Sequence, residues 1–92
     1  MGGDFGYEFT VRSPSNEAQK CTMVLLAVVA ELVKAHTDRD EMPGGSRFWQ
    51  ALCEEVLANY LYQNAAFPPD NLLRIEDYTS GMRRWVESVL AA

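Results

Sequence analysis

The stretch CTMVLLAVVAELVKAH, residues 21–36, decides how this chain folds, because so apolar a segment must be buried over most of its surface. Wound as a helix, the segment gathers its charged side chains, Glu31 and Lys34, on one narrow strip. The remaining apolar or small residues cover roughly 240° of the circumference, whereas a surface helix needs only about 100°. We therefore predict a helix over residues 16–36 that is either central or shared with a partner.

The residues that precede this segment follow a different period. Tyr7, Phe9 and Val11 alternate with polar residues, which is typical of a short strand or an extended arm. We predict such an arm over residues 1–14. A single strand cannot satisfy its own backbone, so the arm either pairs with a copy from another chain or lies across the helices.

Two further helices are predicted after the apolar segment. Pro43, Gly44 and Gly45 interrupt the helical pattern and predict a loop. Ser46 is a good N-cap for a helix over residues 46–63. Two prolines then end that helix, and an amphipathic stripe predicts a third helix over residues 71–91. Gly81 can divide the third helix, because glycine costs about 1 kcal/mol in a helix interior. The predicted fold is all-α: one domain, residues 1–92, a compact bundle of three to four helices with a short N-terminal extended arm.

Composition limits the classes of partner. The 92 residues include 8 Lys and Arg against 13 Asp and Glu, for a net charge of −5, which argues against direct nucleic-acid binding. With 48% hydrophobic residues, the chain has more apolar surface than three helices readily cover, so we expect a homodimer with the first or second helix at its interface.

The location of the protein is also limited by its sequence. No apolar run approaches the ~20 residues that span a bilayer, and the first residues lack the basic and apolar regions of a signal peptide. The two cysteines, Cys21 and Cys53, are expected to be buried free thiols in a reducing compartment. We therefore expect a cytoplasmic protein with no membrane partner.

The densest set of metal-ligand types lies in one loop, which holds His36, Asp38, Asp40 and Glu41. An EF-hand would need another oxygen ligand two residues after Asp40, where Met42 stands. We interpret this segment as a solvated acidic loop and predict no metal and no cofactor.

Residues that could support catalysis are isolated from one another. Cys53 lies among apolar neighbours beside Glu54, the opposite of the electropositive setting that activates a thiol. Glu54 and Glu55 are adjacent, so their side chains diverge on a helix. An enzyme would need a pocket with Glu54 or His36 as its base, and we predict no catalytic residue.

The leading hypothesis is a non-enzymatic protein–protein interaction module, such as a small regulator, adaptor or subunit. It would present an apolar and aromatic helix face to its partner. We expect Tyr62 to be exposed, since it falls on the polar side of its helix. The candidate contacts are Tyr7, Phe9, Trp49, Tyr60, Tyr62 and Trp85.

The alternative hypothesis is a small acidic inhibitor of phage or bacterial origin that occupies a basic surface of a nuclease or nucleic-acid-binding complex. Its binding would fall steeply with salt. The moderate charge density ranks this hypothesis second. The acids that would contact the basic surface are Asp38, Asp40, Glu41, Glu54 and Glu55.

Overall fold

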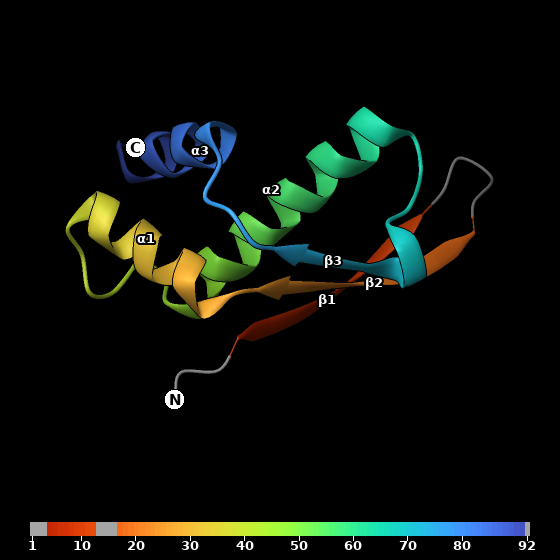
Figure 1. Cartoon of the computed structure of the whole chain (residues 1–92), viewed down its shortest axis with the longest axis horizontal. Coiled ribbons are helices and arrows are strands. Elements are labelled where there is room, and N and C mark those ends of the chain that lie inside the picture. The colour runs from red at the N-terminus through yellow and green to blue at the C-terminus, as the bar shows by residue number, and fades with distance from the viewer. Residues whose placement is uncertain (1–3, 13–16, 92) are drawn as a thin grey trace.

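The computed structural model of the chain describes residues 4–12 and 17–91 (Figure 1). These residues form three helices and a three-stranded sheet, so the prediction of an all-α bundle is wrong and the fold is α+β. The elements in chain order are β1 (Phe5–Arg12), β2 (Ala18–Leu25), α1 (Ala27–Thr37), α2 (Ser46–Asn64), the 3-10 helix η1 (Pro69–Asn71), β3 (Leu72–Ile75) and α3 (Ser80–Ala91).

The sheet has the order β1-β2-β3, with β2 in the middle. β1 and β2 are antiparallel, and Phe9 lies opposite Cys21. β2 and β3 are parallel, and Met23 lies opposite Leu73. The parallel pair requires a long crossover, which α1 and α2 supply.

The helix predicted over residues 16–36 is wrong in its first half, where residues 18–25 form β2. Cys21, Met23 and Leu25 are fully buried on one side of this strand, while Thr22 and Val24 are only half-buried on the other. We call the first side the covered face and the second the open face. The apolar content of the segment concealed this period of two, which matches the alternation in β1. The predicted helix start at residue 16 lies outside the described residues.

The helix predicted over residues 71–91 is also wrong in its first half, which holds η1, β3 and a loop. Four residues of β3 are too few for their period to distinguish a strand from a helix. The helix itself begins at Ser80, where the hydroxyl of Thr79 accepts the Met82 N–H at 3.2 Å. Gly81 therefore stands at the start of α3 and does not divide it.

The helix predicted over residues 46–63 coincides with α2. Gly45 precedes α2 with φ 58° and ψ −123°, a conformation that glycine adopts far more readily than other residues. Residues 1–3 and 13–14 of the predicted arm lie outside the described residues. The rest of the arm contains β1, which pairs with β2 of the same chain and packs against the core.

One hydrophobic core joins the sheet to the helices. Figure 1 shows α2 running across the sheet, and α1 and α3 near the end at which β2 and β3 both finish. The buried residues of this core are Cys21, Met23, Leu25, Val29, Ala30, Val33, Met42, Phe48, Leu52, Cys53, Leu57, Ile75, Met82 and Val86.

Within the described part of the chain, no helix is both long and apolar enough to cross a membrane.

Candidate functional site: a groove beside an open strand edge

A groove of about 630 Å³ lies between the C-terminal half of α2, β3 and the first turn of α3. Val56 and Tyr60 line it from α2, and both side chains are half-buried. Leu73 and Ile75 line it from β3. The groove therefore combines apolar side chains with a stretch of strand backbone.

The backbone of β3 is unpaired where it meets the groove. The N–H of Leu26 donates to the carbonyl of Ile75 at 3.3 Å, which fixes Ile75 as a residue whose polar groups face β2. Successive residues of a strand point their N–H and C=O groups to opposite sides, so those of Arg74 face away from β2. Within residues 4–12 and 17–91, neither group of Arg74 has a hydrogen-bond partner.

The charges around the groove are mixed in sign. Glu55 lines it from α2 and accepts a hydrogen bond at 3.0 Å from the amide of Asn59. Glu76 and Asp77 add two carboxylates, and Arg74 and Arg84 add two guanidinium groups. The groove therefore presents no strong field of either sign, and apolar contacts and backbone hydrogen bonds are its main binding features.

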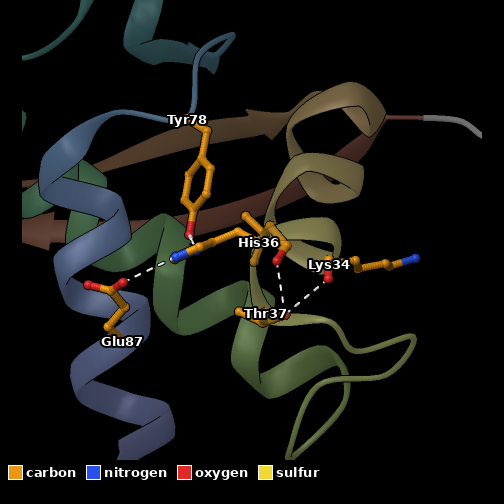
Figure 2. Close-up of polar contacts among 6 residues, drawn as sticks. Lys34, His36, Thr37, Tyr78 and Glu87 are labelled. Carbon is orange, nitrogen blue, oxygen red and sulfur yellow. Dashed lines mark hydrogen bonds and ion pairs between the residues drawn. The ribbon is translucent and has the colours of Figure 1, made fainter.

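A second polar cluster forms where α1 approaches α3 (Figure 2). His36 Nε2 lies 3.1 Å from the carboxylate of Glu87, and His36 Nδ1 lies 2.7 Å from the hydroxyl of Tyr78. In the neutral ring, Nε2–H donates to the carboxylate, so Nδ1 accepts the proton of the tyrosine hydroxyl. The Arg83 guanidinium also lies 5.7 Å from the centre of the Tyr78 ring.

The parallel strands explain why this cluster forms. β2 and β3 end on the same side of the sheet, so α1 and the segment that holds Tyr78 leave the sheet together. Burial is the main cause that raises the pKa of Tyr78; the Arg83 charge lowers it, and the Glu87 charge raises it further. Tyr78 is not among the residues that line the groove. The cluster therefore acts as a clip that joins α1 to α3 and to the segment that precedes it.

Sequence reasoning missed both the groove and the clip. The groove depends on β3, which was predicted as helix. The clip joins His36 to Tyr78, 42 positions further along the chain, and to Glu87, 51 positions further along. No local sequence pattern reports contacts at such separations. The one available signal is the single histidine, which the sequence places at the end of a predicted helix.

The predicted aromatic contacts divide between core and surface. Tyr7 and Phe9 are half-buried and pack against the core. Trp49 and Trp85 both lie against the buried ring of Phe48, with centroids 5.1 and 5.7 Å from its own. These four side chains contribute to packing within the chain.

The remaining two aromatic residues lie on α2 in different surroundings. Tyr60 lines the groove. Tyr62 is 90% exposed, as the sequence predicted, and does not belong to the groove lining. Of the six aromatic candidates, Tyr60 alone is among the groove residues.

The five predicted acidic contacts do not form one surface. Asp38 and Asp40 line a second hollow together with a third acid, Glu31, and two bases, Lys34 and Arg39. Glu41 and Glu54 are exposed, while Glu55 belongs to the groove. Among the described residues, no three His, Cys, Asp or Glu side chains gather closely enough to hold a metal ion.

Both cysteines are buried and free. Burial raises the pKa of the Cys53 thiol from its ordinary value of 9.0 to about 12, so it stays protonated and unreactive near neutral pH. The pKa of Tyr7 is raised as well, first by its burial and then by the neighbouring Cys53. α2 therefore packs Cys53 close to β1.

Comparison of the chain with protein-family models, with curated proteins and with solved structures gave no match, so its function has to be inferred from the surfaces described above.

Proposed function

We propose that this protein is a non-enzymatic interaction module that binds an extended segment of a partner protein along β3. The observation that carries the proposal is the unpaired N–H and C=O of Arg74 at the margin of the groove. An extended peptide that joins the sheet at such an edge gains main-chain hydrogen bonds from the strand and side-chain contacts from the groove.

The groove suggests which kind of segment would fit. A strand added beside β3 would direct alternate side chains toward Val56 and Tyr60 and the others toward the open face. A partner segment with apolar residues at alternate positions would therefore match the groove. Because the surrounding charges are mixed, we expect its affinity to depend only weakly on salt.

Two other readings receive less support. For the inhibitor hypothesis, Asp38 and Asp40 lie beside Lys34 and Arg39, so the acids there are partly neutralised by bases. For an enzyme, the only histidine is engaged in the clip. We also propose a cytoplasmic location, because the buried free thiols suit a reducing compartment.

A panel of random peptides displayed on phage provides the test, with the full chain as bait. We expect the selected peptides to alternate apolar residues and to bind in isothermal titration with similar affinity at low and high salt. Arg74→Pro removes the outward N–H but none of the bonds from β3 to β2, so it should weaken binding by about tenfold. Arg74→Ala keeps that N–H and serves as the matched control.

Two tyrosines of α2 provide a second pair of variants. Tyr60→Ala should weaken the selected peptides because it removes a wall of the groove, while Tyr62→Ala should leave their affinity unchanged. Amide NMR spectra of the labelled chain should shift around residues 73–77 on peptide addition. Equal binding by Arg74→Pro and Arg74→Ala, or shifts confined to another surface, would overturn the proposal.

A further inference from the structure

Within residues 4–12 and 17–91, no strand pairs with the opposite edge of the sheet, which β1 forms. The Ile75 carbonyl accepts the Leu26 N–H, and this bond shows which way the backbone groups of β2 point. The N–H and C=O groups of residues 22 and 24 face β3, and those of residues 21, 23 and 25 face β1. On β1, Phe5 lies opposite Leu25, Tyr7 lies opposite Met23, and Phe9 lies opposite Cys21. The N–H and C=O groups that point to the outer edge of β1 are therefore those of Gly6, Glu8, Thr10 and Arg12.

This edge has none of the proline, bulge or short length that often prevents strands from pairing between molecules. β1 is eight residues long, contains no proline, and keeps an unbroken register from Phe5 opposite Leu25 to Arg12 opposite Ala18. Long, regular edges of this kind are templates for another strand.

The sequence of β1 is complementary to itself in one antiparallel register. A two-fold axis at Thr10 places Thr10 opposite its own copy and places Glu8 opposite Arg12 of the partner subunit, twice per dimer. An axis at Glu8 would oppose two carboxylates, and an axis at Arg12 would oppose two guanidinium groups. Arg12 also interacts within its own chain, and its five N–H donors can serve more than one acceptor.

The covered face favours the same register. Tyr7, Phe9 and Val11 are half-buried, because β1 is the last strand on that side of the sheet. With the axis at Thr10, Phe9 lies opposite Val11 of the partner subunit. These residues form a non-hydrogen-bonded pair, in which side chains approach most closely.

From these observations, we propose that two copies of this chain pair through β1, antiparallel about Thr10, and join their sheets into one continuous sheet. The second copy would shield Phe9 and Val11 and satisfy the outward backbone groups of Glu8 and Thr10. This interface lies at the opposite edge of the sheet from the groove, so the inference does not depend on the peptide-binding proposal.

Charge reversal tests the pairing in solution. The wild-type chain should be a dimer by size-exclusion chromatography with light scattering across a wide concentration range. Glu8→Arg and Arg12→Glu should each weaken the dimer by about tenfold or more, and the double variant should recover it. Lys20→Glu, on the same face of the central strand, is the matched control and should remain a dimer. Circular dichroism establishes that each variant is folded.

Cross-linking tests the register. Thr10→Cys brings two thiols opposite each other at about 5.5 Å between Cα atoms, a separation that a disulfide spans. Oxidised glutathione should therefore link this variant into a covalent dimer, whereas Glu8→Cys, whose copies are offset along the strands, should stay unlinked. A monomeric wild type, a dimer indifferent to both single charge reversals, or equal cross-linking by the two cysteine variants would each overturn the proposal.

Discussion

The two halves of the apolar segment at residues 21–36 both carry large aliphatic side chains but lie in different surroundings. In β2, Leu25 is fully buried, with a strand on either side and helices over one face. In α1, Leu32 is 48% exposed and Val28 is 58% exposed, although Val29 and Val33 are fully buried. The difference shows that burial depends on which neighbours the fold supplies, since Leu25 and Leu32 are the same residue with different exposure.

More of the chain surrounds the strand half, β2, than surrounds the helical half, α1. β2 pairs with both other strands and contributes three fully buried side chains to the core. α1 is attached mainly along one side, through Val29, Ala30 and Val33, and through the clip at His36. We therefore expect the strand half to contribute more to global stability, and α1 to be the part that opens first.

The largest expected effect comes from a matched pair of leucines. Leu25→Ala should lower the free energy of unfolding by about 2–5 kcal/mol, because it leaves a cavity in the core. Leu32→Ala should change it by no more than about 0.5 kcal/mol, because that side chain already contacts water. Urea denaturation of both variants measures the difference. Similar losses would show that the two halves are equally embedded.

Alkaline pH tests the packing of α2 against the strand half. The pKa of Cys53 is 9.0 in ordinary surroundings and about 12 in the fold, so the unfolded chain loses this proton first. The contribution of this thiol to stability is complete below about pH 9 and falls by about 1.4 kcal/mol per pH unit until the folded pKa is reached. Cys53→Ala should give a flatter decline above pH 9 in urea titrations. Parallel curves for the two proteins would contradict this account.

The smallest expected effect concerns the attachment of α1. Tyr78→Phe removes the hydroxyl that donates to His36 and should cost about 1 kcal/mol, measured by hydrogen exchange of the α1 amides. The β2 amides should change less, because their ladder does not involve the clip. Tyr62→Phe, which alters an exposed tyrosine, is the control. Equal acceleration in α1 and β2 would mean that the two halves unfold as one unit.

Local signals were enough to locate part of this fold. Gly45, with its positive φ, marks the start of α2, and the prolines at 68 and 69 limit how far the helix can extend. The predicted cap at Ser46 is wrong, because Gly45 is the N-cap and no side chain caps this end of the helix. The exposure of Tyr62 followed from its place on the helix. The alternation of β1 likewise identified an extended segment, although not its partner.

Tertiary structure decided the rest, because the deciding contacts lie far apart in the chain. Residues 18–25 can be read as helix or strand, and pairing with β1 and β3 selects the strand. β3 is too short to be identified by its own period, so the groove beside it had no signature in the sequence. The clip requires that β2 and β3 run parallel and release α1 and Tyr78 at one end of the sheet. Composition thus determined how much apolar surface the chain must bury, and strand pairing determined where that surface lies.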